Sequence, residues 1–322
     1  MASMENLPVV LFHRRSSYTL ALKDRLSPHF HLLDPFDTQE PISSFLSVHG
    51  YSIRALLCVG YTPITSETLN FLPSLELIVA GSAGVDHIAL QECHRRGITI
   101  TNASLAFAED AADHAVGLLI DVLRRISAAD RFVRAGSWPV MGDFPLGFKL
   151  GGKRVGIVGY GSVGSEVAKR LAAFGCNIAY NSRKRKPSVP FPYYENVHNL
   201  AVDSDILILC CSLTKETHHI INEGVMKSLG KGVIVNVGRG SLVDEKTLVQ
   251  FLVEGKLGGA GLDVFENEPH VPKEMLCLDN VVLSAHRAVF TPESFEALIE
   301  LCLANLKAFF SNEPLQSVVK IE

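Results

Sequence analysis

The chain has 322 residues, of which 47% are hydrophobic and 20% are charged, and its formal net charge at pH 7 is −4. This length suits two globular domains, and the negative charge argues against a nucleic-acid partner. No stretch is apolar over the roughly 18 residues that a membrane span needs, so no membrane association is expected. The seven cysteines lack metal-ligand spacing. They predict reduced thiols and no metal site, and an N-terminus without an apolar signal region predicts a cytoplasmic protein.

Short apolar runs separated by helix-compatible segments predict a small α/β domain with a parallel sheet at the start of the chain. Its expected strands are residues 9–12, 55–59, 77–80 and 98–101. A helical pattern follows over residues 105–126 and is expected to link this domain to a second one. Residues 136–152 are expected to be irregular.

The second half of the chain predicts a full dinucleotide-binding sheet. Its expected strands lie near 155–158, 178–180, 206–210, 233–237, 260–264 and 281–284. Thr291-Pro292-Glu293 then has the pattern of a helix start, and the helix is expected to run to about Phe310 and return the chain to the first domain. The expected fold is therefore α/β with two Rossmann-like or flavodoxin-like parallel-sheet domains. The substrate domain comprises 1–101 and 290–322, and the dinucleotide-binding domain, 102–289, is inserted in it.

The most informative motif is the run Gly159-Tyr160-Gly161-Ser162-Val163-Gly164, which follows an apolar strand pattern and opens a helical one. In this context Gly159 allows a tight turn, and Gly161 lets the backbone approach a pyrophosphate. Gly164 lets the helix pack close to its strand, and the pyrophosphate lies at the helix N-terminus. The motif with these neighbours predicts a dinucleotide site.

The segment after the next predicted strand indicates which dinucleotide is preferred. An NAD-binding protein should place an acidic residue there to meet the ribose 2′-hydroxyl, but the chain reads Asn181-Ser182-Arg183-Lys184-Arg185-Lys186. A hydroxyl and a guanidinium suit a 2′-phosphate, so NADPH is expected to bind better than NADH. In isolation such a run would be a solvated basic turn or a nuclear localisation patch. Its distance from the glycines favours the phosphate for Ser182 and Arg183, leaves Lys184 open, and assigns Arg185 and Lys186 to the surface.

Polar residues follow three of the predicted strands, at the sheet edge where ligands bind in open parallel sheets. Arg239 follows 233–237, Glu268 lies shortly after 260–264, and His286 follows 281–284. An arginine can grip a carboxylate and polarise a ketone, a histidine can donate a proton, and a carboxylate can orient the imidazole. Glu266, two residues away, is an alternative to Glu268.

These residues, with the glycine motif and the domain order, resemble the D-isomer-specific 2-hydroxyacid dehydrogenase family over nearly the whole chain. The resemblance is closest to plant NADPH-dependent glyoxylate/hydroxypyruvate or hydroxyphenylpyruvate reductases, which carry a similar Ser-Arg pair. It implies that Arg239, Glu268 and His286 are catalytic, with His286 as the general acid. It implies further that backbone amides at Ser82, Ala83 and Gly84 bind the substrate carboxylate together with Arg239. Cofactor contacts are expected from the six residues of the glycine motif and from Ser182, Arg183, Lys184, Cys211, Val237, Gly238, Arg239, Asp263 and His286.

Within the resemblance, Asp263 corresponds to the aspartate that meets the nicotinamide amide, although it could instead cap a local turn. Ser82 could likewise only shape a tight loop whose amides do the binding. The family commonly has Pro before the histidine and small residues after it, whereas this chain has Ala285 before it and Arg287-Ala288-Val289-Phe290 after it. The bulk of Phe290 is expected to narrow the pocket.

The expected function is NADPH-dependent reduction of a small 2-ketoacid, hydroxypyruvate or glyoxylate, to the D-2-hydroxyacid or glycolate. A homodimer is expected, and Trp138 resembles a position that in some relatives reaches a neighbouring subunit, a local core role being the alternative. An aromatic substrate such as hydroxyphenylpyruvate is a second possibility. A dinucleotide-sensing module similar to transcriptional corepressors is the alternative from another functional class.

Overall fold

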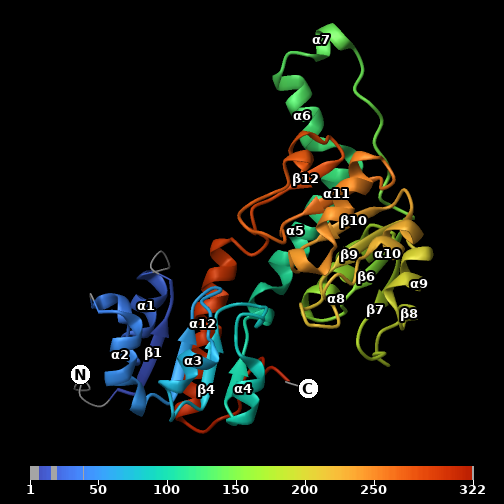
Figure 1. The fold of residues 1–322 in the computed structure, drawn as a ribbon. Coiled ribbons are helices and arrows are strands. Elements are labelled where there is room, and N and C mark those ends of the chain that lie inside the picture. The colour runs from blue at the N-terminus through green and yellow to red at the C-terminus, as the bar shows by residue number, and fades with distance from the viewer. Residues whose placement is uncertain (1–6, 16–19, 39, 321–322) are drawn as a thin grey trace. The chain divides into compact units, whose positions relative to one another are not determined.

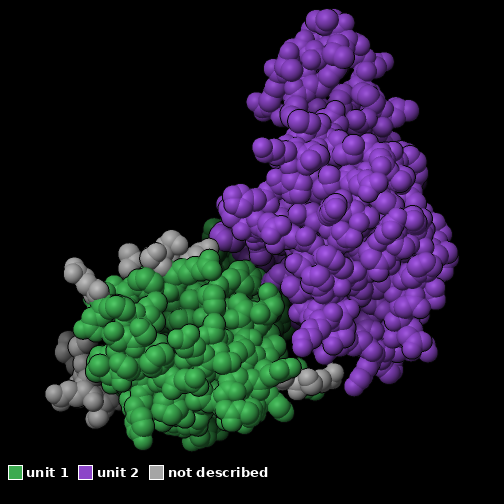
Figure 2. Space-filling model, in the orientation of Figure 1, with its two compact units in different colours: residues 1–107, 291–322 green, residues 108–290 purple. Residues whose placement is uncertain are grey.

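The computed structural model describes residues 7–15, 20–38 and 40–320. Residues 1–6 and 321–322, which bear on the expected absence of targeting signals, lie outside this part of the chain. The chain divides into two compact units (Figure 2). Unit 1 comprises residues 1–107 and 291–322, and unit 2 comprises residues 108–290. Each unit is built around one parallel sheet (Figure 1).

Unit 1 contains a five-stranded parallel sheet in the order β2-β1-β3-β4-β5. This order is that of flavodoxin-like folds. The strands are β1 (Val9–His13), β2 (His31–Leu33), β3 (Ala55–Cys58), β4 (Leu77–Ala80) and β5 (Thr99–Thr101). The helices are α1 (Leu20–Leu26), α2 (Ile42–His49), α3 (Ser66–Asn70), α4 (Leu90–Arg95) and α12 (Pro292–Phe310). The continuous apolar runs of β3 and β4 are fully buried, as parallel strands covered on both faces must be.

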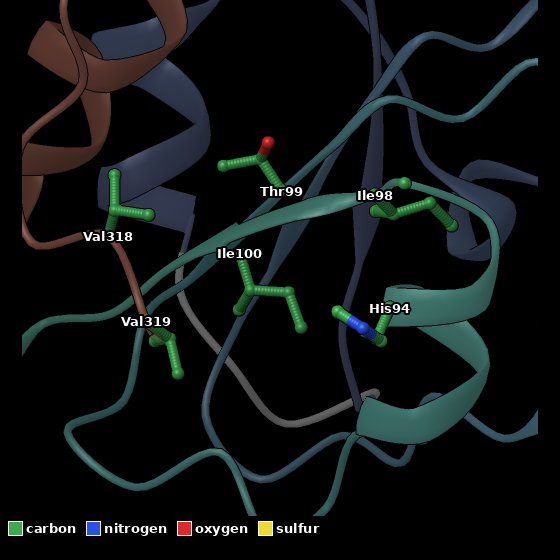
Figure 3. A pocket seen from close by; sticks show the side chains of 7 residues that line it. His94, Ile98, Thr99, Ile100, Val318 and Val319 are labelled. Carbon is green, nitrogen blue, oxygen red and sulfur yellow. The ribbon is translucent and has the colours of Figure 1, made fainter. Parts of the chain in front are cut away.

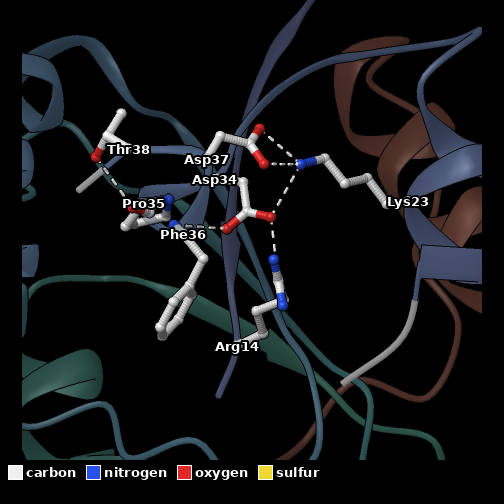
Figure 4. A network of polar contacts seen from close by, with 7 residues as sticks. All are labelled: Arg14, Lys23, Asp34, Pro35, Phe36, Asp37 and Thr38. Atoms are coloured by element: carbon white, nitrogen blue, oxygen red, sulfur yellow. Dashed lines mark hydrogen bonds and ion pairs between the residues drawn. The ribbon is translucent and has the colours of Figure 1, made fainter. Parts of the chain in front are cut away.

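A buried carboxylate, Asp34, organises the turn that follows β2 in unit 1 (Figure 4). One oxygen accepts the backbone N–H of Phe36 at 3.0 Å. The other accepts Arg14 Nε at 2.9 Å and Lys23 Nζ at 3.0 Å. Lys23 also contacts the exposed carboxylate of Asp37 at 2.6 Å. Burial would raise the pKa of Asp34, but Lys23, the Phe36 N–H and Arg14 outweigh it and hold the pKa below its usual value.

We expect Asp34→Asn to destabilise the β1–β2 region by about 1.5–3 kcal/mol at pH 7, because two cations lose a buried partner. The folded pKa lies below the unfolded one, so this stabilisation is complete above the unfolded pKa, about 3.9, and is lost as the pH falls through the folded pKa. Hydrogen exchange of β1 and β2 amides at pH 7 and in acid measures the effect. Asp37→Asn is the control, and we expect it to cost at most about 1 kcal/mol because this carboxylate is exposed. Equal losses for the two variants would contradict the assignment.

A small hollow of 230 Å³ opens beside β5 at the edge of the unit 1 sheet (Figure 3). It is lined by His94, Gly97, Ile98, Thr99, Ile100, Val318 and Val319. The C-terminal segment meets the strand here through a bridge between Thr101 and Val318. Its lining is mostly aliphatic and includes none of the candidate site residues, so we assign it a packing role at the sheet edge.

Unit 2 contains a seven-stranded parallel sheet in the order β12-β11-β10-β9-β6-β7-β8. Six of these strands reproduce the 3-2-1-4-5-6 order of a dinucleotide-binding sheet, and β12 extends it by one strand. The strands are β6 (Arg154–Val158), β7 (Asn177–Asn181), β8 (Tyr193–Tyr194), β9 (Ile206–Leu209), β10 (Val233–Asn236), β11 (Gly259–Leu262) and β12 (Val281–Leu283). The strand order reverses between β6 and β9, which is where ligands bind in such sheets.

Helices cover both faces of this sheet, and alternate side chains of each strand enter different cores. Ile206 and Ile208 of β9 pack in one cluster, while Leu207 and Leu209 pack in the other. The helices of unit 2 are the C-terminal part of α5 (Ser104–Arg124), α6 (Ile126–Arg134), α7 (Trp138–Met141), α8 (Ser162–Ala173), α9 (Val197–Val202), α10 (Glu223–Leu229) and α11 (Glu245–Val253). The prediction of two parallel-sheet α/β domains is confirmed.

The structure differs from the predicted elements in several places. The sequence did not predict β2 and β8, because strands of three and two residues are too short to show a hydrophobic period. The helix predicted over 105–126 is α5, which ends at Arg124 because Arg125 is left-handed, with φ of 56°. The segment 136–152 is irregular except for the short helix α7. The predicted helix from Pro292 to Phe310 is confirmed as α12, with the Thr291 hydroxyl accepting the Ser294 N–H at 3.0 Å.

Across the described ranges, none of the helices combines the length and the apolar character required to cross a membrane.

Candidate active site

The glycine motif forms a tight turn between β6 and α8 in unit 2. Gly159 has φ of 96°, a left-handed conformation that favours glycine, and a Cβ there would lie 2.4 Å from the Cys211 backbone nitrogen. A Cβ on Gly164 would lie 2.1 Å from the Gly159 carbonyl oxygen, so only glycine lets the helix approach its strand. A Cβ on Gly161 would meet nothing within 4 Å.

The open space at Gly161 is what a bound pyrophosphate requires. Gly161 is the N-cap of α8, a helix of 12 residues. Packing within the protein does not require a glycine at this position, since a Cβ there would contact no other atom. A helix N-terminus presents unsatisfied N–H groups and a partial positive charge to an anion. The turn at the switch point of the sheet therefore fits a dinucleotide, and Ser162, Val163 and Gly164 form the helix start that would face its phosphates.

The basic segment 182–186 is tied to the glycine turn by the end of β7. The Gly159 N–H donates to the Asn181 carbonyl at 2.9 Å, so the two strand ends keep a fixed spacing. Arg183 and Lys184 are exposed, as a group that meets a ligand phosphate must be. The Ser182 hydroxyl donates to the Lys184 carbonyl at 2.7 Å. A bound 2′-phosphate would compete with that carbonyl for the hydroxyl proton.

Arg239 follows β10 in a turn that is shaped by the buried side chain of Asn236. Asn236 accepts the Gly238 N–H at 3.0 Å and donates to the Arg239 carbonyl at 2.8 Å. A Cβ on Gly240 would lie 1.9 Å from the Phe265 carbonyl carbon. This turn therefore packs directly against the loop after β11, and it brings Arg239 beside the loop that carries Glu268.

His286 and Glu268 form a hydrogen-bonded pair. His286 Nδ1 and Glu268 Oε2 are 2.8 Å apart, and the other Glu268 oxygen accepts the Phe265 N–H at 3.1 Å. Burial would raise the pKa of Glu268, but His286, the Phe265 N–H and the charge of Arg239 hold the pKa below its usual value. Glu268 is therefore ionised at neutral pH and suited to stabilise an imidazolium.

The alternative carboxylate, Glu266, faces a different histidine. Its Oε1 lies 2.5 Å from His219 Nε2, and its backbone N–H donates to Glu245 at 3.1 Å. The loop after β11 thus carries the carboxylates of two carboxylate–histidine pairs, and the pair that involves Glu268 is the one influenced by the charge of Arg239. The sequence could not distinguish Glu266 from Glu268, which are only two residues apart. The loop conformation determines which carboxylate contacts which imidazole.

Asp263 is buried, and four protein groups surround its carboxylate. Oδ1 accepts Ser284 Oγ at 2.6 Å and the Arg287 N–H at 2.8 Å, and Oδ2 accepts the Ala288 N–H at 2.9 Å. His114 Nε2 lies 3.4 Å from Oδ1. Burial would raise the pKa of Asp263, but these donors, with His114 the largest contributor, lower the pKa to about 2. Asp263 therefore caps the turn around His286, the local role left open from the sequence.

Two residues of this arrangement were missed from the sequence. Ser284 directly follows β12, the strand that delivers His286, and could have been found as a polar residue after an apolar run. His114 lies on α5 and hydrogen-bonds to the Ser284 hydroxyl at 2.8 Å. No local signal marks His114, because its partner is 170 residues away. The backbone N–H of His286 also donates to the Asp263 carbonyl at 2.7 Å, which holds His286 at its positive φ of 50°.

Cys211, Val237 and Gly238 lie on the loops after β9 and β10, next to the glycine turn. A Cβ on Gly238 would lie 3.1 Å from the Cys211 carbonyl oxygen, so the two loops pack closely. Burial raises the pKa of the Cys211 thiol to about 12, which keeps it uncharged. Among the residues that the structure describes, no group of three or more potential ligands is placed to hold a metal ion.

The substrate residues predicted in unit 1 lie on the loop after β4. Ser82 is buried, its hydroxyl donates to the Gly84 carbonyl at 2.8 Å, and its carbonyl accepts the Ala103 N–H at 2.9 Å. Asn102 donates to the Ala83 carbonyl at 2.9 Å. Within the described residues, the N–H groups of Ser82, Ala83 and Gly84 have no protein acceptor. The side chain of Ser82 therefore shapes the loop, and three successive amides are available to an anion such as a carboxylate.

Comparison with known proteins identifies the family. Residues 116–288 match the model of the D-isomer specific 2-hydroxyacid dehydrogenase NAD binding domain. The chain belongs to this family. It is 56% identical, over the full length of both chains, to a glyoxylate/hydroxypyruvate reductase of Arabidopsis thaliana. It is 44% identical to the hydroxyphenylpyruvate reductase of Plectranthus scutellarioides, covering 98% of this chain and 100% of that one.

A solved reductase structure has a similar fold. The NADPH-dependent glyoxylate/hydroxypyruvate reductase of Sinorhizobium meliloti, in complex with NADP and malonate, superposes with a TM-score of 0.88. The two proteins are 34% identical, and the match covers 98% of this chain and 97% of the other. The resemblance predicted from the glycine motif, Arg239, Glu268 and His286 is confirmed at the level of the family. This dehydrogenase is thus an oxidoreductase with a dinucleotide-binding domain.

Proposed function

We propose that this dehydrogenase reduces hydroxypyruvate or glyoxylate to the D-2-hydroxyacid or glycolate, with NADPH as the preferred cofactor. The observation that carries the proposal is the Glu268–His286 pair, 2.8 Å apart, beside Arg239 and at the same sheet edge as the glycine turn. The full-length similarity to a plant glyoxylate/hydroxypyruvate reductase supports the substrate class. Oxidation of NADPH with a panel of 2-ketoacids, followed at 340 nm, tests it.

The bound cofactor would supply the hydride, and the residues of the chain would supply geometry and charge. The amides of Ser82, Ala83 and Gly84 are proposed to bind the substrate carboxylate, and Arg239 to bind the substrate and polarise its ketone. Because Glu268 engages Nδ1 of His286, proton transfer to the developing alkoxide would use Nε2. The ionised Glu268 stabilises the charged imidazole that holds this proton.

Preference for NADPH is supported by the segment that follows β7. An NAD-binding sheet has a carboxylate after its second strand to meet the ribose, whereas this chain has Ser182, Arg183 and Lys184 after β7. A carboxylate would repel a 2′-phosphate, and these residues would not. The related reductase from Sinorhizobium meliloti is described as NADPH-dependent and was solved with NADP. NADH is proposed to bind more weakly.

The aromatic substrate remains the second candidate, supported by the similarity to a hydroxyphenylpyruvate reductase. We expect hydroxypyruvate and glyoxylate to have higher kcat/KM than 4-hydroxyphenylpyruvate, because Val289 and Phe290 replace smaller residues after the histidine. Steric overlap in a packed site costs on the order of 1–3 kcal/mol, or about 10–100-fold in rate. Phe290 is 42% exposed as a residue, and the centre of its ring lies 5.3 Å from Arg287 Cζ.

The test compares kcat/KM for the three ketoacids in the wild-type enzyme and in Phe290→Gly. A wild-type preference for the aromatic acid would refute the size argument. An unchanged ratio in the variant would show that Phe290 is not its cause. If no ketoacid in the panel supports turnover while NADPH binds, the sensing module becomes the better assignment.

We also propose that this dehydrogenase is a homodimer that buries the segment 126–148. In unit 2 this segment, with α6 and α7, extends away from the sheet (Figure 1). Its apolar side chains at Trp138, Val140, Met141, Leu146 and Phe148 are exposed, and Leu146 is 92% exposed. Contiguous exposed apolar surface is typical of protein interfaces. Light scattering is expected to give a dimer for the wild type and a monomer for Val140→Glu/Met141→Glu, and a wild-type monomer would contradict the proposal.

The cytoplasm remains the proposed compartment. All seven cysteines are free thiols, as is usual in a reducing environment. Fractionation of cells that express the full-length chain, with an antibody against it, tests this assignment.

A further inference from the structure

The basic segment 182–186 is held at both ends by tyrosine hydroxyls. At its start, the Tyr193 hydroxyl donates to the Ser182 carbonyl at 3.2 Å. At its end, the Tyr180 hydroxyl accepts the Lys186 N–H at 2.9 Å and lies 3.4 Å from the Lys186 carbonyl. Tyr180 belongs to β7 and Tyr193 to β8, neighbouring strands at one edge of the unit 2 sheet (Figure 1). The two tyrosines therefore fix the path of the backbone that carries Arg183 and Lys184.

The same tyrosines connect this segment to the glycine turn. The rings of Tyr180 and Tyr193 lie 5.5 Å apart, and the ring of Tyr160, inside the glycine motif, lies 4.7 Å from that of Tyr180. Lys186 Nζ lies 5.9 Å from the centre of the Tyr160 ring. An aromatic cluster under the surface thus supports both the turn that would face the pyrophosphate and the segment that would face the ribose.

A run of four exposed cations needs such support, because like charges held close together repel one another. The Asn181 end is already fixed, since its carbonyl accepts the Gly159 N–H at 2.9 Å. Beyond Asn181, the Tyr193 hydroxyl holds the backbone of the segment at Ser182, and the Ser182 hydroxyl holds it at the Lys184 carbonyl. At Lys186 the backbone is held by the Tyr180 hydroxyl and by the Val189 N–H, which donates to the Lys186 carbonyl at 3.1 Å. Loss of one tyrosine hydroxyl would remove no cationic side chain from the segment. It would remove a backbone anchor and so allow the segment to sample other conformations.

We propose that the hydroxyl of Tyr193, together with that of Tyr180, is a specificity-determining positioning group that holds residues 182–186 ready for the 2′-phosphate of NADPH. The inference rests on the proposed cofactor preference and adds residues that do not themselves contact the cofactor. A ligand without the 2′-phosphate does not need the segment in one conformation. The hydroxyls should therefore affect binding only of ligands that carry the 2′-phosphate.

The chain offers a matched control on the same strand. Tyr194 follows Tyr193, but its hydroxyl donates to Asp203 at 2.8 Å and does not contact the basic segment. Tyr193→Phe and Tyr194→Phe remove the same atom from adjacent residues. Calorimetric titration with adenosine 2′,5′-bisphosphate and with adenosine 5′-monophosphate measures binding without turnover, and the Kd values for NADPH and NADH complete the comparison.

We expect Tyr193→Phe to weaken binding of adenosine 2′,5′-bisphosphate and NADPH about three- to tenfold, the effect of one neutral hydrogen bond. Binding of adenosine 5′-monophosphate and NADH should change less than about twofold, and Tyr194→Phe should change neither pair, because its hydroxyl is elsewhere. Tyr180→Phe should act in the same direction as Tyr193→Phe. Because Tyr180 is fully buried, the melting temperature of the Tyr180→Phe variant is measured as well, to detect a loss of stability.

Arg183→Ala separates this inference from the proposed cofactor preference. If Arg183→Ala lowers the NADPH preference but Tyr193→Phe does not, the positioning role is wrong and the preference stands. If neither variant changes the ratio of the Kd values, the assignment of the segment to the 2′-phosphate fails and the positioning role fails with it. Equal weakening of both ligands by Tyr193→Phe would indicate a general structural role and would overturn the inference. In Tyr193→Phe/Arg183→Ala, the two effects should be less than additive, because both act on one contact.

Discussion

Replacing His286 with alanine is expected to lower turnover by about 10²–10⁴-fold, the usual contribution of a general acid. The imidazole is held by Glu268 at 2.8 Å and by the turn that Asp263 caps, so its loss removes the proton donor without removing any part of the glycine turn. The Kd for NADPH should therefore stay within about twofold of the wild type, since a side chain outside the phosphate contacts contributes little to it. Stopped-flow turnover at saturating ketoacid and fluorescence titration of NADPH measure the two quantities.

His219→Ala is the control for this prediction. His219, which lies between β9 and α10, forms the second carboxylate–histidine pair with Glu266, whose loop also carries Glu268, and the two side chains are 2.5 Å apart. If proximity of a histidine to this loop were all that mattered, the two variants would lose turnover equally. We expect His219→Ala to lose less than about tenfold, because it removes a structural hydrogen bond and no proton donor. Turnover near that of the wild type in folded His286→Ala would remove His286 from the mechanism.

Replacing Arg183 with alanine is expected to weaken NADPH binding by about 1.5–3 kcal/mol, roughly 10–150-fold, which is the scale of hydrogen bonds to a charged group. NADH should be almost unaffected, because it has no 2′-phosphate to lose a partner. We expect this selectivity because Arg183 is exposed and lies next to the end of β7. That strand end is fixed to the glycine turn, since the Gly159 N–H donates to the Asn181 carbonyl at 2.9 Å. Fluorescence titration with both cofactors gives the ratio directly.

Arg185→Ala provides the matched control, since it removes the same charge two residues further along the run. A general electrostatic attraction would make the two variants equal and would disappear at high salt. A direct contact with the 2′-phosphate should make Arg183→Ala several times more damaging than Arg185→Ala at every ionic strength. Equal losses for NADPH and NADH in Arg183→Ala would exclude the 2′-phosphate assignment.

The sequence by itself determined the parts of this dehydrogenase whose signals are local. Continuous apolar runs marked the long parallel strands, because strands buried on both faces must be apolar throughout. The glycines at 159, 161 and 164 marked the dinucleotide turn. The backbone conformation at Gly159 and the close approach at Gly164 exclude a side chain, and Gly161 leaves open space at the helix start. Thr291 and Pro292 marked the start of α12, because capping interactions act over three or four residues and are therefore also local.

Only the tertiary structure decided which residues act together. It placed Glu268, and not Glu266, against His286, because a loop conformation and not a spacing orients each carboxylate. It surrounded the Asp263 carboxylate with donors from the His286 turn. His114 joined that network from a helix 170 residues away from its partner.

The same limit applies to the tyrosines that hold the basic segment. The hydroxyl of Tyr193 reaches back 11 residues to Ser182 because β8 pairs with β7, and β8 is too short to be predicted from its own sequence. Contacts of this kind depend on how strands pair and how loops turn. Those choices are set by the packing of the whole unit, so no window of sequence contains them.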